Sequence, residues 1–148
     1  MKNLSFLFSE EEKHIVASIQ EAERNTSGEI RVFIESKCKY VDALDRAKEV
    51  FESLEMHKTK FRNAALIYIA TKDRQIAVFG DKGIYEKSKD ENFWKGVVAQ
   101  LKEAFKAGNY AKGIAAAILE MGELLKIHFP YEDKGDENEL PDEIVYGE

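Results

Sequence analysis

The first apolar pattern of the chain has the period of a helix. Ser9 and Glu12 have the spacing of a capping box, in which each side chain bonds a free backbone N–H at the start of a helix. Ile15 and Ile19 follow on one face of that helix. Residues 25–28 (NTSG) are turn formers that end in glycine, so they predict where the helix stops.

The next segments alternate or are continuously apolar, as strands are. Residues 29–35 (EIRVFIE) alternate and predict a strand. Asp42 then caps a second predicted helix. Residues 63–70 are nearly all apolar, which is typical of a strand covered on both faces, and residues 75–79 predict a third strand. The short polar connection between these two strands makes residues 63–79 a predicted hairpin.

Two further helices follow the hairpin. Ile84–Lys87 is predicted to add a short edge strand before them. A third helix begins near Asn92, and Gly108 ends it. A fourth carries apolar residues from Tyr110 onward and ends at Pro130.

The order of elements predicts an α/β fold. A strand, a helix and a strand in succession imply a right-handed crossover and a parallel pair. The hairpin adds an antiparallel strand, so the sheet is mixed. We expect an αβα sandwich with a mixed sheet of about four strands flanked by four helices. Apolar residues near the C-terminus indicate that the tail packs back on this body.

Charge divides the chain at residue 130. Residues 131–148 hold eight acidic residues and one lysine, whereas residues 1–130 hold 20 acidic and 21 basic residues. We therefore predict a body over 1–130 with balanced charge and an acidic tail over 131–148. Nucleic acid is excluded as a partner by this charge pattern, because binding phosphates requires clustered Lys and Arg. Cations are compatible with it.

Compartment and membrane association follow from two other features. The longest apolar run, residues 64–70, is far short of the roughly 20 residues that a membrane span needs, so no membrane insertion is expected. The N-terminus lacks the apolar stretch and cleavage site of a secretory signal. Cys38 is the only cysteine, which excludes an internal disulfide. We expect a cytoplasmic protein.

Two carboxylates at strand ends are candidates for a site. Glu29 begins the first strand, and Asp81 follows the third strand in a turn flanked by glycines. The ends of sheet strands are where α/β folds hold their ligands. The alternative for Asp81 is a turn residue that bonds its own backbone.

The tail offers a second set of oxygen ligands. Asp133, Asp136, Asn138 and Glu139 lie at short, irregular spacing around a glycine, as the ligands of a hard cation do. The spacing is not that of an EF-hand. A tail folded back on the body would bring these carboxylates across the turn at Asp81, where a cation would relieve their repulsion. The alternative is a solvated acidic tail.

Basic residues near the same strand ends are candidates for binding an anion. Arg62 comes just before the second predicted strand and has the geometry to clamp a phosphate or a carboxylate. Lys82 follows Asp81 directly. A surface ion pair is the alternative for Arg62. The familiar nucleophile, P-loop and HExxH motifs are absent from the sequence.

Several segments together resemble the TPM domain family. They are Thr26-Ser27-Gly28-Glu29-Ile30, then Thr59-x-x-Arg62-Asn63-Ala64, then Gly80-Asp81-x-Gly83-Ile84, and last Phe105-x-x-Gly108-x-Tyr110-x-x-Gly113-Ile114. The family includes relatives of thylakoid-lumen acid phosphatases and photosystem II repair proteins. The resemblance implies an αβα sandwich and a stand-alone bacterial-type domain.

Three functions stay open from the sequence, the third of which is a purely structural interaction domain with neither a metal response nor hydrolysis. The first is a divalent-metal-binding module, with Ca²⁺ favoured over Mg²⁺, whose cation orders the tail and the loop after the third strand and has a regulatory role. The second, which the resemblance implies, is a metal-assisted phosphomonoesterase in which Glu29 and Asp81 hold the metal. The sequence identifies no protein partner and does not settle whether the chain is an enzyme.

Overall fold

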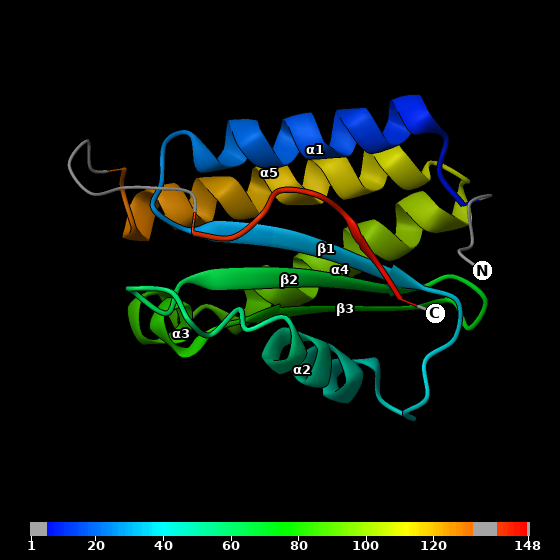
Figure 1. Cartoon of the computed structure of the whole chain (residues 1–148), viewed down its shortest axis with the longest axis horizontal. Coiled ribbons are helices and arrows are strands. Elements are labelled where there is room, and N and C mark those ends of the chain that lie inside the picture. Colours follow the sequence, from blue (N-terminus) through cyan, green and yellow to red (C-terminus); the bar gives the residue numbers. More distant parts are fainter. Residues whose placement is uncertain (1–5, 132–138, 148) are drawn as a thin grey trace.

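A computed structural model describes residues 6–131 and 139–147 of the chain. Its elements follow the order of Figure 1: α1 (Ser9–Glu23), β1 (Glu29–Glu35), α2 (Ala43–Ser53), β2 (Ala64–Ala70), β3 (Gln75–Gly80), α3 (Lys82–Ser88), α4 (Glu91–Lys106), α5 (Tyr110–His128) and β4 (Val145–Tyr146). The predicted α/β class is confirmed. The structure has five helices in its described residues, against four predicted.

The strands form one mixed sheet in the order β3-β2-β1-β4. β1 and β2 pair in parallel, with Glu29 opposite Ala64, and α2 connects them, so the predicted crossover pair is confirmed. β2 and β3 form the predicted antiparallel hairpin. Every residue of β1 and β2 is buried, since strands in the middle of a sheet are covered on both faces.

The predicted strand at Ile84–Lys87 is wrong, because these residues lie in α3. Asp81 caps this helix by accepting a hydrogen bond from the Lys82 N–H at 2.7 Å, so the chain turns out of the sheet directly after β3. The fourth strand is instead β4, in the tail, where Val145 lies opposite Phe33 of β1.

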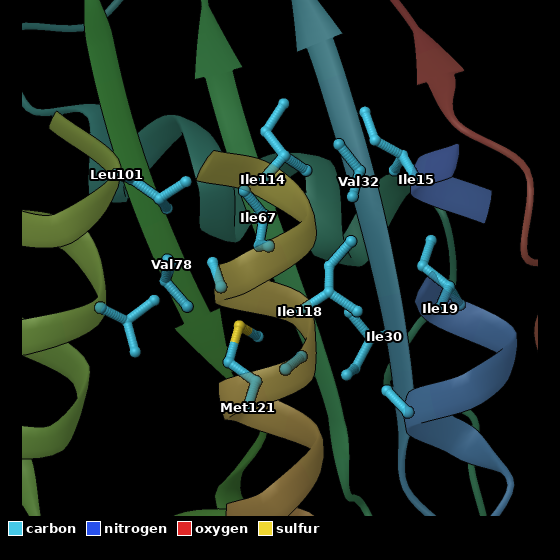
Figure 2. Packing of buried hydrophobic residues seen from close by; sticks show 14 of the residues in the cluster. Ile15, Ile19, Ile30, Val32, Ile67, Val78, Leu101, Ile114, Ile118 and Met121 are labelled. Atoms are coloured by element: carbon cyan, nitrogen blue, oxygen red, sulfur yellow. The ribbon is translucent and has the colours of Figure 1, made fainter. Parts of the chain in front are cut away.

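Helices cover the two faces of the sheet unequally. On one face, α1 lies over β1, α5 over β2 and α4 over β3 (Figure 2). Their apolar side chains form a single cluster with the sheet, and its labelled members in Figure 2 are Ile15, Ile19, Ile30, Val32, Ile67, Val78, Leu101, Ile114, Ile118 and Met121. The other face has a smaller core, formed with α2 around Phe51, Leu66 and Tyr68.

Helix starts agree with the sequence at two of three predicted positions. Asp42 accepts from the Leu44 N–H at 3.0 Å, and Asp90, two residues before the predicted Asn92, accepts from the Phe93 N–H at 3.2 Å. At α1 the cap lies one residue earlier than Ser9: the Phe8 N–H donates to Glu11 Oε1 at 2.8 Å. Each of these bonds satisfies an N–H that the first turn of a helix or its cap would otherwise leave free.

At the C-terminal end of β1, the end opposite to Glu29, an ion pair connects the strand to α2. Arg46 donates to both carboxylate oxygens of Glu35, at 2.8 and 2.9 Å. Glu35 is buried and also accepts the Tyr68 hydroxyl. This pair holds the single helix of the thinner layer against the sheet.

The predicted return of the tail onto the body is confirmed for residues 139–147. Leu140 is buried in the α2-side core, and Ile144 and Tyr146 pack on the larger one. The Tyr146 hydroxyl donates to Glu12 of α1. In Figure 1 this segment, drawn in orange and red, runs along β1 at the margin of the sheet.

Within the described residues, no helix combines the length and the apolar character that crossing a bilayer requires.

Candidate functional site

Strand order brings Glu29 and Asp81 to the same end of the sheet. β1 begins at Glu29 opposite Ala64, the first residue of β2, and the antiparallel β3 ends beside that residue. The Asp81 N–H donates to the Ala64 carbonyl at 2.9 Å. We call this end of the sheet the acidic edge and define it by Glu29, Asn63 and Asp81.

Glu29 fastens the tail to the acidic edge. Its side chain accepts the N–H of Glu139 at 2.9 Å and that of Leu140 at 3.1 Å. Only 2% of Glu29 is exposed, and this burial raises its pKa to about 7. Glu139 in turn accepts the Lys60 N–H at 3.1 Å through its carboxylate. The carboxylate of Glu139 therefore lies over the segment that leads into β2.

A second carboxyl, which is partly buried, lies beside Glu29. Glu23 is the last residue of α1, and its carboxylate accepts the Ile30 N–H at 2.8 Å. β4 does not extend far enough along β1 to bond this N–H. Its side chain is hydrogen bonded to Asp142 of the tail. Burial raises the pKa of Glu23 to about 10, and the charges of Asp142 and Glu29 add to the effect. Three acidic side chains thus share one region, and at neutral pH repulsion favours keeping a proton there.

Arg31 supplies positive charge to the same region. It is 8% exposed, and its pKa is lowered by burial, while the charges of Glu143, Asp142 and Glu23 oppose that shift. Its Nε has no hydrogen-bond partner within residues 6–131 and 139–147. Arg31 therefore offsets part of the acidic charge of this region.

Asp81 and Arg62 are paired. Arg62 Nε and an Nη donate to the two Asp81 oxygens at 2.7 and 2.9 Å. The Asp81 side chain is buried, whereas 38% of the Arg62 side chain is exposed. The ion-pair alternative for Arg62 is therefore the arrangement present. A metal at Asp81 would have to compete with this guanidinium, so the metal-ligand role of Asp81 stays a prediction. Lys82 is exposed on the first turn of α3.

Asn63 has an unused buried oxygen at the acidic edge. The residue is fully buried, and its amide Nδ2 donates to Ser27 Oγ at 3.2 Å. Its Oδ1 has no hydrogen-bond partner in the part of the chain that the structure describes. A buried oxygen without a donor costs free energy, and an amide oxygen is a normal ligand of Ca²⁺.

Sequence reasoning missed three residues of this region: Glu23, Asn63 and Asp142. A signal existed for Glu23, because it lies four residues after Ile19 and therefore on the buried face of α1. Asn63 belongs to a segment that carried the family resemblance. Asp142 required knowledge of where the tail returns, which no local pattern gives.

The full predicted ligand set lies partly outside the described residues. Asp133, Asp136 and Asn138 all fall in the segment 132–138. Among the residues that are described, no three or more His, Cys, Asp or Glu side chains are grouped so as to hold a metal ion. The predicted metal ligands are therefore neither confirmed nor contradicted.

Similar solved structures share the whole architecture. The NMR structure of BA42 protein from the psychrophilic bacterium Bizionia argentinensis is 42% identical, with 99% of each chain covered and a TM-score of 0.88. The solution NMR structure of the N-terminal domain of a protein from P. gingivalis is 17% identical, covering 88% of this chain and 85% of its own, with a TM-score of 0.68.

A third solution structure, the N-terminal domain of cg2496 protein from Corynebacterium glutamicum, is 15% identical over 80% of this chain and 74% of its own, with a TM-score of 0.63. These last two show the fold alone. No curated protein matches the chain. The family profile described as TPM domain matches residues 2–124, which include Ser27, Glu29, Asn63 and Asp81. The chain is therefore a member of the TPM domain family.

Proposed function

We propose that this TPM domain protein binds a divalent cation at the acidic edge, with Ca²⁺ preferred over Mg²⁺. The cation would order the C-terminal tail and the turn at Asp81 against the sheet, with a regulatory role for its occupancy. A cytoplasmic location stays part of this proposal.

One observation carries the proposal: a buried carboxylate, Glu29, holds the acidic tail by its backbone at the end of the sheet. The two hydrogen bonds from the Glu139 and Leu140 N–H groups hold this part of the tail at the acidic edge. Asp133, Asp136 and Asn138 lie in that preceding segment. A cation would neutralise charge that this arrangement otherwise concentrates.

The donor chemistry supports a hard cation. The described candidates, Glu29, Asn63 and Glu139, all offer oxygen, and Asn63 Oδ1 has no donor among the described residues. Ca²⁺ accepts six to eight oxygens in variable geometry, whereas Mg²⁺ requires a near-ideal octahedron. Ligands drawn from a strand end, a loop and a tail suit the more permissive ion.

Thermal unfolding of the chelator-treated protein, titrated with Ca²⁺ and separately with Mg²⁺, tests the proposal. A ligand that binds only the folded state adds about 2.7 kcal/mol at 100 times its Kd, which raises Tm by roughly 5–10 °C in a domain of this size. We expect a saturable rise with Ca²⁺ at lower concentration than with Mg²⁺. If neither ion raises Tm, the proposal is refuted.

The Glu139→Gln variant tests whether the tail binds the cation through this carboxylate or only through its overall negative charge. It removes one carboxylate and leaves an acceptor for the Lys60 N–H. We expect Ca²⁺ to bind roughly tenfold more weakly, because a charged ligand is lost. Glu123→Gln, on the exposed side of α5, removes the same charge and should leave the affinity unchanged. Equal affinity in all three proteins would exclude Glu139 as a ligand.

A metal-assisted phosphomonoesterase is the second candidate, and the exposure of Arg62 at the acidic edge favours it. A guanidinium that is paired with Asp81 but 38% exposed has donors with which to meet a phosphate. Hydrolysis of p-nitrophenyl phosphate should then require Ca²⁺ or Mg²⁺ and should be lost in Asp81→Asn. Absence of turnover in the metal-loaded protein would exclude this candidate and leave the binding proposal standing.

A further inference from the structure

The outer side of β3 is an unpaired sheet edge that lies at the bottom of a groove. β3 ends the strand order, so no strand within residues 6–131 and 139–147 pairs with it there (Figure 1). A groove of about 370 Å³ runs along Ile76, Ala77 and Val78. These residues are only 5–9% exposed although they belong to an edge strand, which means that the edge is recessed.

Backbone groups of Ile76 and Val78 face this groove. In an antiparallel pair, residues alternate between those bonded to the partner and those directed away from it. The bond from the Asp81 N–H to the Ala64 carbonyl sets the phase of that alternation. Phe79 and Ala77 therefore bond to β2, whereas Ile76 and Val78 present their N–H and C=O groups outward. Such a row of groups is a template for another extended strand.

The walls of the groove differ in chemistry. On one side stand Tyr85 of α3 and Trp94 and Val98 of α4, together with Glu91 and Lys95. On the other side stand Leu44 and the cap residue Asp42 at the start of α2. The α4 wall is mainly apolar and aromatic. The α2 wall ends in an exposed carboxylate.

Trp94 gives an independent sign that the groove is incomplete. The residue is 6% exposed, yet its indole N–H has no acceptor within the described residues. Buried indole N–H groups usually find a partner. A segment bound in the groove adds polar groups beside this wall and is a source of the missing acceptor.

We propose that this groove binds an extended segment of a partner protein, which adds to β3 as a fifth strand. Side chains of a strand point alternately to its two faces, so those on one face meet Tyr85, Trp94 and Val98 and those on the other meet Leu44 and Asp42. Charge complementarity identifies the segment as apolar on the α4 side and basic on the Asp42 side. This surface is distinct from the acidic edge and does not depend on a cation.

A second copy of the chain does not fit this surface. Paired strands lie about 4.8 Å apart. The β3 strand of a second copy would itself lie recessed between its own α2 and α4. The two sets of walls would meet before the strands reached pairing distance, whereas a single extended segment has no such walls.

Trp94 allows direct measurement, because it is the only tryptophan of the chain. The probe is a blocked peptide of six residues, the length of β3, with alternating Val and Lys. We expect a saturable change in Trp94 emission with a Kd of roughly 10 µM to 1 mM. In NMR spectra, the Trp94 indole N–H should shift and hydrogen exchange at the Ile76 and Val78 amides should slow.

Two controls separate strand addition from adsorption of a cationic peptide. Methylating alternate backbone nitrogens of the probe keeps its side chains and charge but removes its donors, so binding should weaken tenfold or more. Asp42→Asn keeps the α2 cap and should weaken binding several-fold, whereas Glu103→Gln, which removes a charge from the exposed side of α4, should not.

Equal binding of the methylated probe, or binding that leaves the Ile76 and Val78 amides unchanged, would overturn the proposal. So would the absence of binding at millimolar probe. A concentration-dependent dimer that protects the same two amides would overturn it in favour of a second copy. Unchanged Tm of each variant confirms that its effect on binding is not a loss of folding.

Discussion

Replacing Gly83 by alanine is expected to lower the free energy of unfolding by about 3 kcal/mol. A Cβ at this position would lie 2.2 Å from the Phe61 carbonyl oxygen and 2.6 Å from that of Arg62. Both atoms belong to the backbone, so neither can move aside as the tip of a flexible side chain would. Overpacking of this kind costs 1–3 kcal/mol and occasionally more.

The close contact between Gly83 and the backbone of Arg62 supports the ion pair between Arg62 and Asp81. The Gly83 N–H donates to the Arg62 carbonyl at 2.9 Å, and Arg62 itself has a positive φ of 52°. Displacing the first turn of α3 from this carbonyl would move Asp81, the cap of that helix, relative to the guanidinium. The alanine variant should therefore also weaken any ligand binding that depends on Arg62.

Gly96→Ala is the matched control. Gly96 lies within α4, and a Cβ there would meet no atom within 4 Å. Alanine in a helix interior is better than glycine by roughly 0.5–1 kcal/mol, so this variant should be more stable than the parent. Denaturant unfolding with an unchanged m-value measures both differences. Equal stability of the two variants would show that the α3 turn yields without cost.

The sequence predicted the central sheet well because its strands carry their own signals. The continuous apolar residues of β2 follow directly from its two covered faces. β1 alternates in sequence although both of its faces are covered, because it buries the charged residues Glu29, Arg31 and Glu35. The parallel crossover then followed from element order alone. The segment Ile84–Lys87 was wrongly predicted as a strand because four residues are too few to distinguish the period of a helix from that of a strand. In the structure, Asp81 caps α3 and is itself held by its ion pair with Arg62. The sequence pattern does not reveal this pair.

The acidic edge was predicted in outline and missed in detail. Glu29 and Asp81 stand out at strand ends, and topology alone brings those ends together. The pairing of Asp81 with Arg62 joins residues 19 positions apart in the chain, and the bonds from Glu29 to the tail join residues 110 and 111 positions apart. Periodic patterns relate only residues that are close in the sequence, so they do not predict contacts over such separations. The tail could be predicted to return but not where its carboxylates would lie.

The β3 groove was not predicted because no local pattern singles out the residues that line it. The structure buries Trp94 of α4 together with Val97 and Leu101, and leaves the neighbouring Phe93 only partly buried. Phe93 and Trp94 both have a helical spacing to the residues that follow, so spacing alone does not choose between them. Leu44 of α2 lies 36% exposed at the groove. An apolar residue that a helix leaves exposed beside a bare strand could mark such a surface.

The second large effect expected is a fall in stability as the pH rises from about 5 to about 8. Burial raises the pKa of Glu29 from 4.5 to about 7, so between these values the folded protein keeps a proton that the unfolded chain releases. Stability then decreases with increasing pH, because the folded state binds more protons. The contribution is complete below pH 4.5 and is lost as the pH rises through 7. A shift of this size corresponds to about 3 kcal/mol.

Glu23 acts in the same direction over a wider range. Its pKa is raised to about 10, so its contribution continues to decline above neutral pH. The carboxylate of Glu35 has the opposite sign: its pKa is lowered, with Arg46 and the Tyr68 hydroxyl stabilising the charged form. Stability from Glu35 is lost only when the pH falls below the usual range of a carboxyl group. The interval from pH 5 to 8 therefore isolates the carboxyls near the tail.

Denaturant unfolding in chelator at a series of pH values measures this slope. Glu29→Gln should remove about half of it below pH 7, because Glu23 contributes the other half. The amide leaves one of the two tail N–H groups without an acceptor, so overall stability should drop by about 1–2 kcal/mol while the slope flattens. Glu123→Gln should keep the parent slope. Because a cation binds the deprotonated carboxylate, saturating Ca²⁺ should also flatten the slope and release protons on binding. A stability that rises between pH 5 and 8 in chelator would contradict the buried state of Glu29, and a slope that Ca²⁺ leaves unchanged would show that any bound cation lies elsewhere.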